Sequence, residues 1–523
     1  TAARKIMKAR LMGALLLVSM IRCSARRRDK KEAPGYGSGM TTDWNAFERR
    51  LAEKRRAIVE GFLEFLRRNT VSQNPEGVRA GSEWLAALMR RRGLETRVLE
   101  TAGAPAVFGE RKVPGATRTV LIYCHYDTKP APAREWFQPS PFEPVFRRVD
   151  DADNAAFVPF DRVPADAMAE WRVFARGSSD DKGPIWSHLE ALGLMDELAL
   201  PPRVNVKFIF DGEEEIGSPF FGPLTEKHRE LLAADLVLVT DGPKHASGRP
   251  TVMFGARGVL KFELTLESAR RDLHSGNFAV PNPNWRLAGL LSSMAAPDGA
   301  PLIEGFEDGV IPPTPAEREL LARYPLDLPA LERELGVTLP GDYLERMMFH
   351  PTLTIRGLQS GFVGAEANTI IPHKTTVAID IRMVKNQKLE RVYARVIDHI
   401  RAQGFEVIEG AEAPLPDHLR GRAVRVVDKG GYDPAKTPAD LPICREVVAA
   451  IERTQGGQEA VVVPTAGGSV PIWAFTDILK VPTLLVPYAN ANNRQHSPNE
   501  HLRLDHLFQG VRTTAGLLHD LGG

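Results

Sequence analysis

The sequence contains little cysteine, no excess of either charge, and no apolar run long enough to cross a membrane. Its three cysteines, Cys23, Cys124 and Cys444, lie far apart among 523 residues. This spacing argues against a disulfide framework and favours free thiols in a reducing compartment. Lys and Arg total 67 against 66 Asp and Glu, so the charge predicts neither a nucleic-acid partner nor binding to an anionic membrane surface.

The first 39 residues differ from the remainder of the chain. Basic residues flank an apolar run at residues 11–21, an arrangement similar to the charged and hydrophobic regions of a secretory signal. The run, of about eleven residues, is too short for a transmembrane helix, and it lacks a good small-residue cleavage site. We therefore expect residues 1–39 to lie outside the fold and the protein to be cytoplasmic. Export is the alternative if residues 1–30 are a genuine signal.

The length of the chain predicts two domains, or one domain with a large insertion. From residue 41 to 249, predicted helices alternate with strand-like runs, as expected for an α/β sheet covered by helices. Between residues 250 and 435, two alternating strands and two helices predict a smaller α+β domain with one exposed face. The first pattern returns from 436 to 523. The simplest architecture is therefore a catalytic α/β domain in two parts, interrupted by an inserted domain.

Ionisable side chains follow the ends of several predicted strands. The stretch LIYCHYD ends a strand-like run in His125 and Asp127. Side chains at i and i+2 of a strand point the same way, so both would lie on one face at the strand's carboxyl end. Open α/β sheets bind their ligands at this edge. Four more segments carry such residues: ARGSSDDKG with Asp180 and Asp181, DGEEEIGS with Glu213–Glu215, TDGP with Asp241, and ANNRQHSPNE with His496.

Each of these segments alone has an ordinary structural explanation. An Asp before a helix is usually a cap, and an acidic triplet is usually a solvated turn. Together, however, two histidines, several carboxylates and no cysteine suit zinc or a similar divalent ion, and the surplus of carboxylates indicates a two-metal site. A metal ligand must stay deprotonated whereas a general base must gain and lose a proton. The neighbouring Glu214 and Glu215 suit that division of roles.

Six motifs in this order, HYD, GSSDDKG, DGEEEIGS, TDGP, RDLHSG and RQHSPNE, resemble those of the M20 family of di-zinc metallopeptidases. The likeness is greatest to its carnosinase-like branch, the cytosolic non-specific dipeptidases, and extends from about Trp44 to the C-terminus. The resemblance implies a mixed-sheet zinc-exopeptidase catalytic domain with an inserted α+β lid, through which two chains form a homodimer. It also implies two zinc ions per subunit, with Mn²⁺ or Co²⁺ as substitutes.

The resemblance further implies roles for individual residues. Asp127 would orient the ring of a metal-bound histidine, and Glu214 would be the general base. The neighbours Asp181 and Glu213 leave the register open at two of these positions, although the following KG and IGS favour the assignment given. Five residues would bind zinc: His125 and Asp241 one ion, Glu215 and His496 the other, and Asp180 both.

Substrate contacts are implied as well. His274 in RDLHSG matches a family histidine that reaches the partner subunit's site and stabilises the oxyanion. Arg382 in DIRMV matches an arginine that binds the substrate carboxylate, a task suited to guanidinium. Arg382 as a strand-surface charge and AGGS as a tight turn are the alternative interpretations. The segment between Arg148 and Arg172 resembles an insertion that would reshape the rim of the site. Further implied contacts are Asn368, Thr369, Gly467, Gly468 and Ser469.

The expected function is metal-dependent hydrolysis of the peptide bond in dipeptides or short peptides. An N-acyl-amino-acid deacylase or desuccinylase-type amidohydrolase with the same metal centre is the alternative. A protein that only binds a metal or solute is disfavoured, because binding needs no spare Glu214. A nucleotide enzyme using TAGGS as a phosphate loop is excluded, since no G-x-x-x-x-G-K-[ST] follows a strand. The expected partners are a peptide and a second copy of the chain, without nucleic acid or membrane.

Overall fold

The computed structural model describes residues 42–152, 155–277 and 280–522. The segment 1–39, predicted to lie outside the fold, is not among the described residues. No helix in the described part of the chain is both long and apolar enough to cross a bilayer. Cys124 and Cys444 are buried and free.

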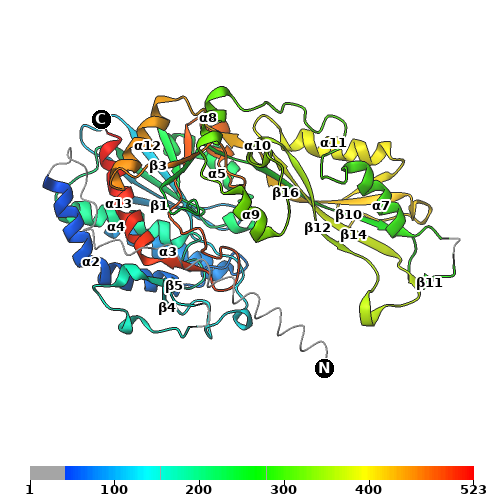
Figure 1. Ribbon diagram of the computed structural model, residues 1–523, viewed down its shortest axis with the longest axis horizontal. Coiled ribbons are helices and arrows are strands. Elements are labelled where there is room, and N and C mark those ends of the chain that lie inside the picture. Colours follow the sequence, from blue (N-terminus) through cyan, green and yellow to red (C-terminus); the bar gives the residue numbers. More distant parts are fainter. Residues whose placement is uncertain (1–41, 153–154, 278–279, 523) are drawn as a thin grey trace.

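An eight-stranded mixed sheet forms the larger body of the molecule (Figure 1). Its four central strands, β6, β3, β7 and β19, are parallel to their neighbours in this set, so their carboxyl ends share one edge of the sheet. The predicted convergence of strand ends is thereby confirmed. In spatial order the strands are β1 (Glu95–Leu99), β2 (Ala106–Arg111), β6 (Asn205–Asp211), β3 (Thr119–His125), β7 (Leu236–Val239), β19 (Thr483–Leu485), β8 (Thr251–Met253) and β18 (Val461–Val463).

Helices cover both faces of this sheet. In β3, Ile122 and Cys124 pack in the core on one face, whereas Leu121 and Tyr123 pack on the other. A strand buried on both sides reads as a continuous apolar run, which is why it was recognisable in the sequence. The first core contains side chains of α2 (Thr42–Leu66), α3 (Pro75–Arg91), α4 (Lys182–Glu197), α12 (Pro442–Thr454) and α13 (Leu504–Asp520). The second contains those of α5 (Phe221–Lys227), α6 (Arg229–Leu232) and a π-helix at Ala474–Leu479.

Two helices begin earlier than the sequence predicted. Helix α2 starts at Thr42, so Asp43, predicted as its cap, lies within the first turn. Helix α3 was predicted from Ser82 but starts at Pro75, where the Asn74 side chain accepts a hydrogen bond from Gly77 N at 3.2 Å. A proline in the first turn is compatible with the helix because its missing N–H would have no partner there.

A five-stranded sheet extends to one side of the larger body (Figure 1). Helices α7 (Pro283–Met294) and α11 (Leu389–Ala402) pack with it in a separate core. The chain leaves after β9 (Gly255–Ala256) and returns at β17 (Ala435–Lys436), which pairs with β9. The predicted domain boundaries at 250 and 435 stay predictions. In spatial order the strands are β12 (Thr352–Gln359), β14 (Lys374–Met383), β10 (Gly258–Glu267), β16 (Ala423–Tyr432) and β15 (Glu406–Glu409).

Part of the predicted insertion packs on the larger sheet. Met348 and Phe349 of α10 share a small core with Val461 and Val463 of β18. This segment therefore lies beside the space between the two sheets. Its helices are α8 (Pro315–Arg323), α9 (Leu328–Leu335) and α10 (Tyr343–Phe349).

The segment between Arg148 and Arg172 connects β4 (Val145–Arg148) to β5 (Trp171–Phe174). These strands form a three-stranded sheet with β20 (His501–Arg503). Val163 and Met168 of the connection are buried in the helix-covered core. None of its described residues lines the cleft between the large and small sheets. The expected effect on the rim of the site is therefore not seen.

A buried carboxylate, Glu500, joins the C-terminal part of the chain to the loop before α4. It accepts backbone hydrogen bonds from Gly177 at 3.0 Å, Ser179 at 2.9 Å and Asp180 at 3.1 Å. It also pairs with Arg176 at 2.8 Å, and both side chains are almost fully buried. Because an ionised carboxylate is a strong acceptor, Glu500 fixes the loop that ends in Asp180.

Replacing Glu500 with glutamine should destabilise the protein strongly. Glu500→Gln removes the charge facing buried Arg176 and turns one acceptor into a donor, so we expect the free energy of unfolding to fall by about 3–5 kcal/mol. Urea denaturation measures this change. Glu446→Gln is the matched control, because Glu446 pairs with Arg118 at the surface and such pairs contribute about 0–1 kcal/mol. Similar losses in both variants would contradict the role given to Glu500.

Candidate metal centre

Four strand ends and one loop bring the predicted metal ligands together. His125 is the last residue of β3. Glu215 and Asp241 follow the adjacent parallel strands β6 and β7, and His496 follows β19. Asp180 belongs to the loop before α4 that Glu500 fixes.

These residues form two overlapping groups. His125, Asp180 and Asp241 make one group, and Asp180, Glu215 and His496 the other, with ligand atoms in each group lying within 4.8 Å of one another. His125 Nε2 lies 2.9 Å from Asp180 Oδ1 and 4.0 Å from Asp241 Oδ2. His496 Nε2 lies 3.0 Å from Asp180 Oδ2 and 3.2 Å from Glu215 Oε2. Asp180 thus faces a different histidine with each oxygen.

The electrostatics of the cluster fit cations. Asp241 Oδ1 is buried without a hydrogen-bond partner in the described part of the chain. Burial and then repulsion from Asp180 raise the pKa of Asp241 to about 6. Burial alone would also raise the pKa of Asp180, but hydrogen bonds with His125 and His496 lower it. Buried carboxylates that lack donors, set beside two imidazoles, suit divalent ions that accept both oxygen and nitrogen ligands.

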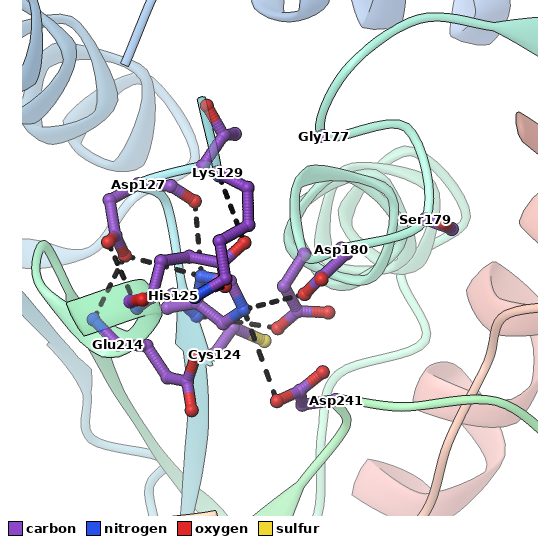
Figure 2. A network of polar contacts seen from close by, with 12 residues as sticks. Cys124, His125, Asp127, Lys129, Gly177, Ser179, Asp180, Glu214 and Asp241 are labelled. Atoms are coloured by element: carbon purple, nitrogen blue, oxygen red, sulfur yellow. Dashed lines mark hydrogen bonds and ion pairs between the residues drawn. The ribbon is translucent and has the colours of Figure 1, made fainter. Parts of the chain in front are cut away.

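Asp127 connects a histidine of the first group to the glutamates after β6. His125 Nδ1 lies 3.3 Å from Asp127 Oδ1 and 3.1 Å from the Asp127 carbonyl oxygen. The same carboxylate accepts the backbone N–H groups of Glu214 and Glu215, each at 3.1 Å. Figure 2 shows His125 between Asp127 on one side and Asp180 and Asp241 on the other. Asp127 therefore holds the His125 ring and the glutamate turn in one arrangement.

The three consecutive glutamates have different surroundings. Glu215 belongs to the second group, and Glu214 lines the adjoining cleft. Burial raises the pKa of Glu214; His125 opposes this, and the carboxylates of Asp241 and Glu215 raise it further. The carboxylate of Glu213 instead lies against Gly103, where a Cβ atom would collide with it. Neither Glu213 nor Asp181 is a member of either group.

The groups border a cleft of about 820 Å³. Arg382, Gly467, Gly468 and Ser469 all line it. Arg382 Nη1 donates a hydrogen bond to Ser469 Oγ at 2.9 Å. Residues of the small sheet and of the TAGGS turn are therefore brought to the same wall as the strand ends.

Three predicted substrate contacts lie elsewhere. His274 ends β11 (Leu273–His274), which pairs with β13 (Ile370–Ile371) at the far end of the small sheet (Figure 1). Thr369 O accepts a hydrogen bond from Ser275 N at 2.9 Å, so Asn368 and Thr369 lie beside His274. All three predicted contacts are exposed, and none lines the cleft of its own chain.

The sequence analysis missed other residues near the groups. Lys129 Nζ lies 3.0 Å from Glu215 Oε2, and Ser72 Oγ donates to Asp127 Oδ2 at 2.8 Å. Lys129 and Glu500 both lie within quoted stretches, HYDTKP and RQHSPNE. Their position a few residues from predicted ligands was the available signal, whereas Ser72 gave none.

Comparisons with known proteins agree on one family. Residues 121–520 match the family model described as peptidase family M20/M25/M40. The Cys-Gly metallodipeptidase dug1 of Schizosaccharomyces pombe is 29% identical over 429 residues, which cover 80% of this chain and 83% of that protein. The Beta-Ala-His dipeptidase of Homo sapiens is 24% identical, covering 80% and 77%.

A solved structure gives the same result. The M20 family metallo-carboxypeptidase Sso-CP2 from Sulfolobus solfataricus superimposes with a TM-score of 0.74 and 28% identity, covering 89% of this chain and 99% of that one. With a family model matched over more than half of its length, the chain belongs to peptidase family M20/M25/M40.

Proposed function

We propose that this chain is a dipeptidase that hydrolyses a peptide bond with two metal ions, zinc being the proposed metal. The observation that carries the proposal is the sharing of Asp180 by two ligand groups, while Glu214 belongs to neither and faces the cleft. A protein that only stored metal would have no use for such a residue. His125 and Asp241 would hold one ion, Glu215 and His496 the other, and Asp180 both.

In the proposed reaction, Glu214 accepts the proton of the attacking water and then gives it to the leaving amine. When bound, the two ions supply Lewis acidity that polarises the peptide carbonyl and makes water more acidic. Asp127 keeps Nδ1 of His125 engaged, so that Nε2 points at the first group. Arg382, held by Ser469, binds the terminal carboxylate of the substrate.

The named relatives favour dipeptides over N-acyl amino acids. The curated relatives reported above are dipeptidases by name, whereas the similar solved structure is described as a carboxypeptidase. Both activities release a C-terminal amino acid, and both would use a cation for the terminal carboxylate. A deacylase with the same metal centre is the less favoured alternative.

We further propose a homodimer formed through the small sheet. His274, Asn368 and Thr369 lie together at its far end, outside the cleft of their own chain. In a dimer they would enter the partner's cleft, where His274 would donate a hydrogen bond to the developing oxyanion. The inserted domain would then be both lid and dimer contact. A cytoplasmic location stays a prediction.

Metal removal should abolish peptide hydrolysis. Because both ligand groups share Asp180, we expect two divalent ions per chain, measurable by elemental analysis of the purified protein. Dialysis against a chelator should remove turnover of dipeptides such as Ala-Gln, and added Zn²⁺ or Mn²⁺ should restore it. N-acetyl-glutamine, tested in parallel, should react far more slowly. Full turnover by metal-free protein, or faster cleavage of the N-acetyl compound, would contradict the proposal.

The three glutamates should fail differently. Glu214→Gln should keep its metal and lose about 10²–10⁴ in kcat, as expected for loss of a general base. Glu215→Gln should lose metal from one group, because it removes a ligand charge. Glu213→Gln is the control, since its carboxylate points toward Gly103, and should retain metal and activity. An inactive, metal-replete Glu213→Gln protein would show that the register is shifted.

Mixing two inactive proteins should restore activity if His274 acts in the partner's cleft. His274→Ala should lower kcat by about 10²–10³, the cost of one oxyanion donor, without loss of metal. A mixed dimer of His274→Ala and Glu214→Gln contains one site with an intact base and an intact partner histidine. A mixture of Glu214→Gln and Glu215→Gln is the control, because each of its sites carries a defect of its own chain. If mass spectrometry verifies exchange and no activity returns, His274 does not act across a dimer.

A further inference from the structure

The wall of the cleft formed by the small sheet carries more positive charge than the terminal carboxylate of a peptide requires. Lys261 of β10 and Arg382 of β14 both line the cleft and are both partly exposed. Val259 is opposite Arg382 in the antiparallel register, and Lys261 is two residues further along β10. Side chains at positions i and i+2 share a face, so Lys261 is the diagonal neighbour of Arg382, within reach of the same ligand.

The ammonium group of Lys261 has no partner of its own. Among the described residues it makes no hydrogen bond and no ion pair, although Asp380 is opposite it in the register. Asp380 Oδ2 lies 3.4 Å from Arg382 Nη2 instead. A partly buried lysine without a counter-ion is costly unless a ligand supplies the charge. Burial lowers the pKa of Lys261, Lys129, Arg356 and Arg382 lower it further, and Glu214 opposes them.

The other charges of the cleft do not neutralise this pair. The carboxylates among its described lining residues are Glu214, Glu215 and Asp241. Two of these belong to the metal groups, and Glu214 is the proposed base. Lys244, another lining residue, is directed elsewhere, since its Nζ donates to Gln509 Oε1 at 2.9 Å. Lys261 and Arg382 therefore remain as a pair of cations facing the substrate.

The order of these groups locates Lys261 along a bound peptide. The scissile bond lies at Glu214 and the terminal carboxylate at Arg382, so the C-terminal residue lies between them. Lys261 is influenced by the charges of both Glu214 and Arg382, which places it beside that residue. In aspartate and glutamate, the side-chain carboxylate is only a few bonds from the terminal one. Two neighbouring cations match two such carboxylates.

We propose that Lys261 and Arg382 together bind the two carboxylates of an acidic C-terminal residue, so that the enzyme prefers peptides ending in glutamate or aspartate. This inference rests on the proposed peptidase function and names its substrate class. Lys261 would act in binding, because its contact with the side-chain carboxylate is the same in the substrate and in the transition state.

The test compares substrates that differ only in one charge. With the metal-loaded protein, kcat/KM for Ala-Glu should exceed that for Ala-Gln by about tenfold, the value of one charge-assisted hydrogen bond. Lys261→Met should bring this ratio close to one, mainly through KM for Ala-Glu, and leave Ala-Gln within about twofold. Lys261→Arg should keep the preference. Lys374→Met is the matched control, because Lys374 is exposed on β14 and does not line the cleft.

A binding experiment provides a second readout. Calorimetry of the metal-loaded protein with the product L-glutamate should give tighter binding than with L-glutamine, and Lys261→Met should remove the difference. Cleavage of Ala-Gln and Ala-Glu at equal efficiency would overturn this inference and leave the peptidase proposal intact. Equal loss of both activities in Lys261→Met would also overturn it, because Lys261 would then serve catalysis. Cleavage of neither peptide by metal-loaded wild-type protein would overturn both proposals.

Discussion

Repulsion among buried carboxylates is the constraint on which this structure depends. Asp180, Glu215 and Asp241 lie within two groups whose ligand atoms are less than 5 Å apart, and like charges at this distance oppose one another strongly when water is excluded. No local turn could hold them there. Their backbones are instead fixed by parallel strand ends and by the loop around Glu500, elements that the helix-covered core makes rigid. The metal ions would supply the positive charge that this arrangement lacks.

Hydrogen bonds from the backbone complete the arrangement. Asp127 receives the N–H groups of Glu214 and Glu215 while it faces His125, so β3 and the turn after β6 cannot move separately. Glu500 does the same for the loop before α4. In both cases a carboxylate outside the metal groups accepts N–H donors from the segment that carries a ligand. Precision at the site thus comes from acids that bind no metal.

Much of the site could be predicted from the sequence because its residues follow apolar runs. His125, Glu215 and Asp241 come directly after strands buried on both faces, and such strands are conspicuous as continuous hydrophobic stretches. The return of α10 to β18 could not be predicted, because the packing of Met348 against Val461 joins distant segments that carry no local signal. The same holds for Glu500, whose partners lie more than three hundred residues earlier. Lys261 read only as an exposed residue of an alternating strand, since its position beside Arg382 depends on the pairing of β10 with β14.

The order of these residues along the chain has a consequence for biosynthesis. Proteins are made from the N-terminus, and early segments begin to fold while later ones are still absent. A growing chain already carries His125, Asp180 and Asp241 when His496 and Glu500 have yet to be added. Until they arrive, the second ligand group lacks its histidine and the loop before α4 lacks its buried acceptor. A nascent chain therefore cannot hold both ions, and it stays unable to cleave peptides until its fold is nearly closed.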